Sequence, residues 1–221
     1  MGADADRVRR SFNLHLIDSL DCDGVSGMPQ LDVTHTDPPD SLRAINSLAR
    51  CSDPDAGVHC FLDDYRIEAT WRDPMRWVGV LDRFHSVIAP DYSLYVDMPE
   101  PMQRHQVYRQ RAVSRIWQDA GLCVIPVLTW GWQETHAFAF EGIPRGGAVA
   151  VSTVGLMRSD DHIRLFETGI AAAIEATRPE LVIAYGNPYP FDAMGAEVRW
   201  YEAGTYARFN EMRAARAAGK E

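Results

Sequence analysis

The segment VIAPDYSLYVDMP, residues 87–99, begins as a short apolar run and then becomes polar and aromatic. A continuous apolar run of this length that ends at a proline is typical of a buried strand. In folds built from parallel strands and helices, the residues that follow each strand line the ligand site. The segment therefore predicts a core strand followed by the wall of a pocket.

Four other apolar runs repeat this pattern, and segments with helical spacing separate them. The runs are VHCFL (58–62), LCVIPVLTW (122–130), GAVAVS (147–152) and LVIAY (181–185). Strands that are apolar throughout and alternate with amphipathic helices indicate a parallel sheet covered by helices. A weaker pattern in EVRWYEA (197–203) predicts a sixth strand.

Helix signals lie between these runs. Asp73 followed by Pro74 is a favourable N-cap and first-turn pair. A second helix is expected over residues 101–120, and a third begins near Ser159 and ends at Pro179. With five or six strands, the chain is short for a complete eight-stranded barrel, which typically needs about 250 residues. The predicted fold class is therefore α/β, either a compact or incomplete TIM-barrel-like fold or an open doubly wound sheet.

The 221 residues divide into three predicted parts. Residues 1–50 have little periodicity and several glycines and prolines, so we predict an irregular N-terminal extension with a short helix near residues 40–49. Residues 51–204 are predicted to form the α/β domain. Residues 205–221 are expected to form a C-terminal helix or a frayed tail.

Composition and motif searches exclude several classes of function. The net charge of −9 argues against binding of duplex nucleic acid, which requires a surplus of basic side chains. The only lysine, Lys220, lies near the C-terminus, which leaves no candidate for a Schiff-base or phosphate-loop lysine. The four cysteines show no CxxC spacing and no HExxH motif occurs, so we expect no metal site and no cofactor.

The chain is also expected to be cytoplasmic and to have no membrane segment. Its scattered cysteines fit reduced thiols, and its N-terminus has no apolar stretch of the kind found in signal peptides. No apolar run approaches the length of about 18 residues that a membrane-spanning helix needs.

Two aspartates, Asp64 and Asp91, follow neighbouring predicted strands and are the predicted catalytic residues. Two carboxyl groups could divide the acid and base roles, or they could orient a sugar and a water. Nearby aromatic side chains suit a ring-shaped substrate such as a base or a sugar. The predicted ligand-binding residues are Asp63, Arg66, Tyr92, Ser93, Tyr95, Arg109, Trp130, Ser152, Thr153 and Asn187.

Several of these residues also have an ordinary structural interpretation. Asp63 and Asp64 could cap a loop or pair with Arg66, and Trp130 and Trp132 could pack in the interior. Both interpretations stay open at the level of sequence.

The stretch between the fourth apolar run and the third helix has a more specific interpretation. Ser152, Thr153 and Gly155 lie between a strand and a helix N-terminus. Their backbone N–H groups could hold an anion, although no GxGxxG motif occurs there.

Four motifs of the chain resemble the bacterial and phage-associated proteins grouped as domain of unknown function 4417. They are VHCFLDDY (58–65), APDYSLYVDMP (89–99), VIPVLTW (124–130) and GIPRGGAVAVSTVG (142–155). The resemblance covers residues 57–187 and implies a link to phages or integrated mobile elements, without implying a reaction. Two positions depart from the family pattern: Cys60 replaces an aromatic residue, and Gln110 in YRQR replaces an asparagine.

Together these observations give a leading hypothesis and two alternatives. The leading hypothesis is an enzyme that binds a small nucleoside, nucleotide or sugar-like ligand at the strand ends, with transfer or hydrolysis of a glycosidic bond as its reaction. The first alternative is a non-catalytic module that binds a host or phage protein through Tyr92, Tyr95, Trp130 and Trp132.

The second alternative is a single-stranded nucleic-acid binder that combines these aromatics with basic side chains. Arg104, Arg111 and Arg115 share one side of the predicted second helix, where a solvated face is the simplest interpretation. Arg109 falls nearer the apolar side and could reach the rim of the pocket.

Overall fold

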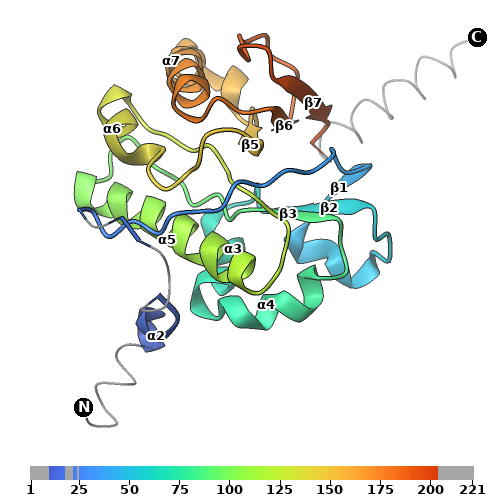
Figure 1. Ribbon diagram of the computed structural model, residues 1–221. Helices are drawn as coiled ribbons and strands as arrows, with labels where there is room; N and C mark the ends of the chain where they lie inside the picture. Colours follow the sequence, from blue (N-terminus) through green and yellow to red (C-terminus); the bar gives the residue numbers. More distant parts are fainter. Residues whose placement is uncertain (1–9, 18–21, 24, 204–221) are drawn as a thin grey trace, which may run out of the picture.

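The computed structural model describes residues 10–17, 22–23 and 25–203 (Figure 1). The predicted C-terminal helix or tail, residues 205–221, lies outside the described residues. Within the described segments, no helix combines the length and the apolar character needed to cross a membrane.

The described residues form seven parallel strands in two sheets (Figure 1). The first sheet consists, in chain order, of β1 (Ser41–Ala44), β2 (Ala56–His59), β3 (Ser86–Ile88) and β4 (Val124–Ile125). The second sheet consists, again in chain order, of β5 (Ala148–Ser152), β6 (Leu181–Tyr185) and β7 (Glu197–Tyr201). An isolated parallel bridge between Val127 and Ala150 joins the sheets, so each strand lies beside its predecessor in the chain.

This strand order confirms the α/β class. A doubly wound sheet reverses its strand order at a switch point, whereas the order of the described strands does not reverse. Among the described residues no pairing of β7 with β1 closes a barrel. The two sheets nevertheless approach each other, because the Tyr201 hydroxyl donates to the Pro39 carbonyl and the rings of His59 and Tyr185 lie 4.3 Å apart.

Helices connect the strands and cover the sheets. The longer ones are α3 (Asp64–Arg72), α4 (Pro74–Leu81), α5 (Glu100–Asp119) and α7 (Asp160–Thr177). The short ones are α2 (Leu14–Ile17), α6 (His136–Ala139) and the 3-10 helices η1 (Ile45–Arg50), η2 (Gln133–Thr135) and η3 (Leu156–Arg158).

The helix-start signals in the sequence are confirmed. The Asp73 carboxylate accepts from the Arg76 backbone N–H over 3.2 Å, and Pro74 occupies the first turn of α4. Ser159 caps α7 in the same way, by accepting from the backbone N–H of His162 over 3.4 Å. Such caps satisfy N–H groups that have no partner inside the helix.

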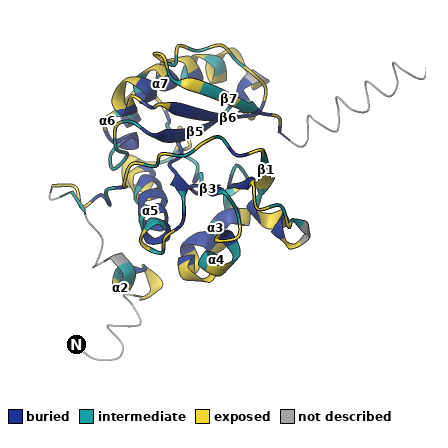
Figure 2. Cartoon of the chain, turned by 45° about the vertical axis from the view of Figure 1, so that its right-hand side comes forward, coloured by how far each residue is buried: buried dark blue, intermediate teal, exposed yellow. Residues whose placement is uncertain are grey.

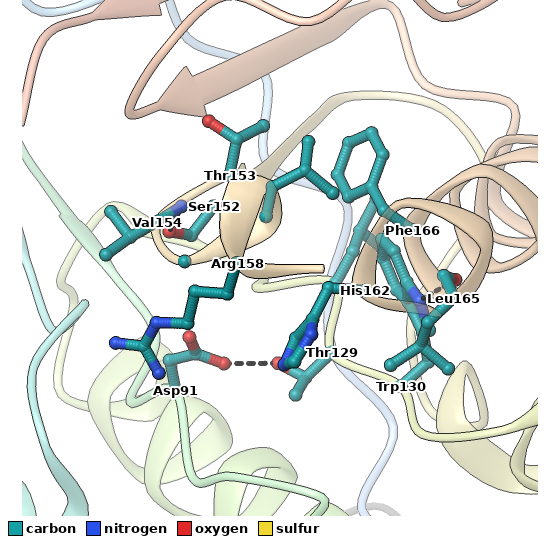
Figure 3. A pocket seen from close by; sticks show the side chains of 13 residues that line it. Asp91, Thr129, Trp130, Ser152, Thr153, Val154, Arg158, His162, Leu165 and Phe166 are labelled. Atoms are coloured by element: carbon teal, nitrogen blue, oxygen red, sulfur yellow. Dashed lines mark hydrogen bonds between the residues drawn. The ribbon is translucent and has the colours of Figure 1, made fainter. Parts of the chain in front are cut away.

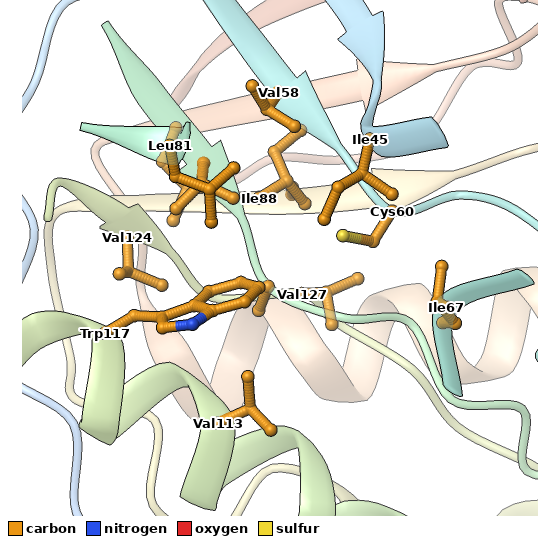
Figure 4. Packing of buried hydrophobic residues seen from close by; sticks show 14 of the residues in the cluster. Ile45, Val58, Cys60, Ile67, Leu81, Ile88, Val113, Trp117, Val124 and Val127 are labelled. Atoms are coloured by element: carbon orange, nitrogen blue, oxygen red, sulfur yellow. The ribbon is translucent and has the colours of Figure 1, made fainter. Parts of the chain in front are cut away.

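Alternate residues of the second sheet face two hydrophobic clusters. In β6, Ile183 belongs to the cluster that also contains residues of the first sheet and of α3–α5, whereas Val182 belongs to the cluster under α7. The first cluster includes Trp117 of α5, which is fully buried and donates from Nε1 to the Pro74 carbonyl over 2.9 Å (Figure 4). Figure 2 shows β5 and β6 buried, β7 partly exposed, and the outer faces of α4 and α7 exposed.

The short helix predicted near residues 40–49 is confirmed only in its second half, because Ile45–Arg50 form the 3-10 helix η1 whereas Ser41–Ala44 form the edge strand β1. Strand β1 pairs with β2 over four residues, from Ser41 with Ala56 to Ala44 with His59. Gly57 permits this pairing, since a Cβ atom there would lie only 2.8 Å from Cγ of Pro39. The domain boundary at residue 50 stays a prediction.

Candidate functional site

A pocket of about 240 Å³ lies at the carboxyl ends of β3, β4 and β5 (Figure 3). Its wall comes from three segments: Asp91 after β3, residues 128–130 after β4, and residues 152–166, which leave β5 and enter α7. The pocket therefore lies where parallel α/β folds place their ligands.

Asp91 supplies the carboxyl group of the pocket. The Thr129 hydroxyl donates to its Oδ1 atom (Figure 3). Burial raises the pKa of Asp91 to about 6; the nearby Asp64 carboxylate adds to this rise, and the hydrogen bond from Thr129 opposes it. Near pH 6 this carboxyl group therefore exists in both its protonated and its ionised form.

A chain of hydrogen bonds from the interior of α5 orients the Thr129 hydroxyl. Nη1 of Arg111 donates to Oε1 of Gln110 over 3.2 Å, and Nε2 of Gln110 donates to Oγ1 of Thr129 over 3.1 Å. A guanidinium group can only donate, which fixes the amide of Gln110 and leaves the Thr129 hydrogen to Asp91. Oδ1 of Asp91 is thus held as an acceptor, so the acidic proton belongs on Oδ2.

The predicted solvated position of Arg111 is wrong, because this side chain is fully buried. Its Nε and Nη2 atoms donate to the carbonyls of Glu141 and Ala139 over 2.8 and 2.7 Å. Burial lowers its pKa to about 9. Helical spacing places Arg111 on one side of α5, but it does not reveal that the segment after α6 covers that side.

Trp130 forms an apolar part of the wall. A Cβ atom at Gly169 would lie 1.9 Å from Nε1 of Trp130, so the indole lies directly against the backbone of α7. Nε1 donates to the Leu165 carbonyl over 3.0 Å, and the Phe166 ring centre lies 5.8 Å from that of Trp130. Trp130 therefore packs in the interior and lines the pocket at once.

The basic part of the wall comes from the end of η3 and the first turn of α7, and it was not predicted from the sequence. Arg158 and His162 both line the pocket (Figure 3). Nδ1 of His162 lies 2.6 Å from Oγ of Ser159. The helix cap at Ser159 is the signal that could have located them, since it sets the residues around it at the mouth of β5.

Four of the predicted site residues come together in this pocket, namely Asp91, Trp130, Ser152 and Thr153. The Thr153 hydroxyl donates to the Asn187 backbone carbonyl over 2.7 Å, which ties the loop after β5 to the loop after β6. The predicted Asn187 therefore contacts a pocket residue, although its side chain is not part of the wall. Thr129 leaves a predicted strand but is absent from the predicted set.

Asp64 lies beside the pocket and not in its wall. Its carboxylate accepts from the backbone N–H and the hydroxyl of Ser93, over 3.1 and 2.8 Å, and from Nε2 of Gln106 over 3.3 Å. Asp64 and Ser93 thus hold the loop that carries Asp91. A catalytic role for Asp64 stays a prediction.

Arg109 and Tyr92 form a second buried group. The Arg109 guanidinium is paired with Glu68 and lies over the Tyr92 ring, 4.1 Å from its centre. The Tyr92 hydroxyl lies 2.7 Å from Oγ1 of Thr70, and Tyr92 has no exposed surface. Both residues support the loop from within, which leaves neither in the wall of the pocket.

The remaining predicted residues lie at the surface. Asp63 pairs with Arg66 over 3.3 Å within one turn, which is the ordinary structural interpretation of this pair. Tyr95 is 53% exposed and lies in the loop after β3, outside the pocket wall.

Comparisons with known proteins show that the chain is similar to two phage proteins. It is 39% identical over 145 residues to the Gene 1 protein of Mycobacterium phage L5 and 37% identical over 145 residues to the Gene 1 protein of Mycobacterium phage D29. Each alignment covers 65% of this chain, and they cover 63% and 54% of the two relatives. The chain thus spans less than two thirds of the relatives' own length. No solved structure shows a significant match.

The family model described as "Domain of unknown function (DUF4417)" matches residues 20–202. This range contains all seven described strands and the whole pocket wall, and it extends beyond the residues 57–187 of the expected resemblance. The chain belongs to the DUF4417 family.

Proposed function

We propose that the pocket binds a small nucleoside, nucleotide or sugar-like ligand and that Asp91 acts on it as a general acid in transfer or hydrolysis of a glycosidic bond. The observation that supports this most is the position of Asp91. Its carboxyl group lies in the pocket wall, with its pKa raised to about 6 and one oxygen held by Thr129. A catalytic acid works best when its pKa lies near the working pH.

The composition of the wall supports a ring-shaped ligand. Trp130 and Phe166 provide aromatic surface, and Asp91, Ser152 and His162 provide polar groups. A cavity of about 240 Å³ lies just below the usual range of about 300 to 1,000 Å³ for ligand sites, which suits a single nucleoside or sugar unit better than a polymer.

In the hydrolytic version of the reaction Asp91 gives its proton to the leaving atom as the glycosidic bond breaks, while the oxygen of a water bonds to the anomeric carbon. The water loses its proton to solvent, and Asp91 regains a proton from solvent, so the carboxylic acid is restored. Asp64 contributes indirectly, because its charge helps to raise the pKa of Asp91 and its hydrogen bonds hold Ser93.

A thermal-shift screen with nucleosides, nucleotides and sugar phosphates tests the proposal. A ligand at about 100 times its Kd should raise the melting temperature by about 5 to 10 °C. We expect this shift to shrink in Asp91→Asn and to persist in Asp97→Asn, the matched control in the exposed part of the same loop. No shift across the panel, or equal shifts in both variants, would argue against the proposal. A hit would then be assayed for release of its base or aglycone.

The two alternatives receive less support. An interaction surface built on aromatics would need Tyr92 and Trp130 at the surface, but Tyr92 is fully buried and Trp130 packs on Gly169. Only Tyr95 and Trp132 of that set are exposed.

Single-stranded nucleic-acid binding would need free basic side chains on α5. Arg104 pairs with Glu100 over 2.8 Å, and Arg115 pairs with Asp119 over 2.8 Å. The third, Arg111, is buried. Each of these three arginines is therefore either paired with an acidic side chain or buried.

A further inference from the structure

We propose that the ligand carries a phosphate group and that Arg158 binds it, so the natural ligand is a phosphate ester and not the free nucleoside or sugar. This inference rests on the proposed function, because it assigns the charge of the ligand that the same pocket would bind. It concerns the part of the wall formed by the loop after β5 and the start of α7.

Arg158 is an arginine without a charge partner in the described part of the chain. Its guanidinium forms no ion pair, side-chain hydrogen bond or ring contact with another described residue. Asp91 faces the same pocket, yet no ion pair joins it to Arg158 (Figure 3). By contrast, Arg164 on α7 pairs with Asp161 over 3.8 Å, and Arg178 pairs with Glu175 over 2.5 Å. The charge of Arg158 is therefore available to a ligand.

The loop is shaped to admit the Arg158 side chain. Gly155 has a φ of +85°, and a Cβ atom there would lie 3.3 Å from Nε and 3.5 Å from Cζ of Arg158. The guanidinium thus lies over the bare backbone of Gly155. Any other residue at this position would both strain the backbone and push against the arginine.

Neutral donors accompany this charge. Oγ of Ser152 accepts the Val154 backbone N–H over 3.1 Å, so its own hydrogen is free for a ligand. Oγ of Ser159 accepts the backbone N–H of His162 and lies 2.6 Å from Nδ1 of the same residue. In the tautomer in which the Ser159 hydroxyl donates to Nδ1, Nε2 of His162 carries an N–H that a ligand can accept.

A guanidinium, a hydroxyl and an imidazole N–H match the oxygens of a phosphate group. A neutral ligand would leave the guanidinium unpaired. This match between donors and charge is the reason to assign a phosphate ester.

Matched pairs of ligands test this assignment by calorimetry at pH 7 and low salt. The pairs are adenosine with adenosine monophosphate, guanosine with guanosine monophosphate, and ribose with ribose 5-phosphate. We expect the ester of at least one pair to bind wild type at least tenfold more tightly than its parent. In Arg158→Gln that ratio should fall towards one, and in Arg158→Lys it should take an intermediate value, because an ammonium keeps the charge but loses the planar fork.

Arg164→Gln is the matched control, since Arg164 lies in the neighbouring helix α7, is 72% exposed and does not line the pocket. Its ratio should equal that of wild type. Gly155→Ala provides an independent variant that keeps the arginine but displaces it, and it should also lower the ratio.

The outcomes separate the two proposals. Equal binding of ester and parent by wild type, or a ratio that Arg158→Gln leaves unchanged, overturns the phosphate assignment while the proposed pocket stands. Failure of every ester and every parent to bind wild type overturns both.

Discussion

The side-chain amide of Gln110 donates to the hydroxyl of Thr129 over 3.1 Å, which couples the buried side of α5 to the pocket. The same nitrogen donates to the Tyr92 carbonyl over 3.1 Å. The Gln110 side chain thus reaches both the loop after β3 and the end of the segment after β4 from within the helix.

Thr129→Val tests the hydrogen bond to Asp91. The hydroxyl lowers the pKa of this carboxyl group, so its removal should raise the pKa above about 6. The pKa is measured by an NMR pH titration of the Asp91 side chain. Thr168→Val is the control, because the Thr168 hydroxyl donates only within α7, to the Arg164 and Leu165 carbonyls. An unchanged pKa in Thr129→Val would contradict the hydrogen-bond chain.

Asp91 and His59 should make opposite contributions to the pH dependence of stability. The pKa of Asp91 rises from 3.8 to about 6, so its stabilising effect is present at low pH and is lost as pH rises through this range. Burial lowers the pKa of His59 from 6.5 to about 4, so its stabilising effect is lost as pH falls through that range. Each pKa shift corresponds to a free energy on the order of 3 kcal/mol. In wild type the two effects on the free energy of unfolding, which change in opposite directions with pH, should largely cancel.

Asp91→Asn should therefore reveal how the titration of His59 changes the free energy of unfolding with pH. We expect the free energy of unfolding of this variant to rise with pH between about 4 and 6.5, and that of His59→Phe to fall over the same range. Urea denaturation at several pH values measures both. Asp97→Asn should follow wild type, and a profile of Asp91→Asn parallel to that of wild type would show that burial does not shift the Asp91 pKa.

Gly169→Ala should destabilise the chain and reshape the pocket. The new Cβ atom would overlap the Trp130 ring, which must move and give up its hydrogen bond to Leu165. We expect a loss of about 1 to 3 kcal/mol by urea denaturation, with a change in tryptophan fluorescence. Gly79→Ala in α4 meets no atom within 4 Å and should instead stabilise by about 0.5 to 1 kcal/mol. Equal effects of the two substitutions would contradict the packing of Trp130 on α7.

Arg111→Lys tests whether the several hydrogen bonds of the buried Arg111 guanidinium stabilise the fold beyond the effect of its positive charge. A lysine ammonium cannot reach the carbonyls of Ala139 and Glu141 and the amide of Gln110 together, so at least one buried acceptor loses its donor. We expect a loss of about 2 to 4 kcal/mol by chemical denaturation. Arg145→Lys is the control, because exposed Arg145 also donates to two carbonyls, those of Ala176 and Glu175. Its loss should stay within about 1 kcal/mol.

The long apolar runs and the helix caps carried most of the information about the fold. Continuous burial makes strands such as Leu181–Tyr185 apolar at every position, and the cap at Ser159 needs only local chemistry. Strand β1 could not be found in this way, because Ser41–Ala44 is an edge strand with a polar, partly exposed sequence. It exists because Gly57 lets Pro39 and Leu42 approach β2, which is a tertiary effect.

The candidate site was partly predictable for a similar reason. Asp91 follows β3 and Ser152 ends β5, so the rule for parallel sheets locates both residues. Arg158 ends η3 and His162 lies in the first turn of α7, so neither residue directly follows a strand. Sequence also could not separate Asp91, which faces the cavity, from Asp64, whose oxygens are taken up by Ser93 and Gln106.

The bridge between Val127 and Ala150 marks the boundary between the two sheets. The two sheets are joined there by a parallel bridge, with hydrogen bonds of 2.8 Å from Leu128 to Ala150 and from Ala150 to Pro126. The pocket straddles this line, with Asp91 on one side and Arg158 on the other. A ligand that contacts both residues would hold the two sheets together. Its binding should therefore slow amide hydrogen exchange at Leu128 and Ala150.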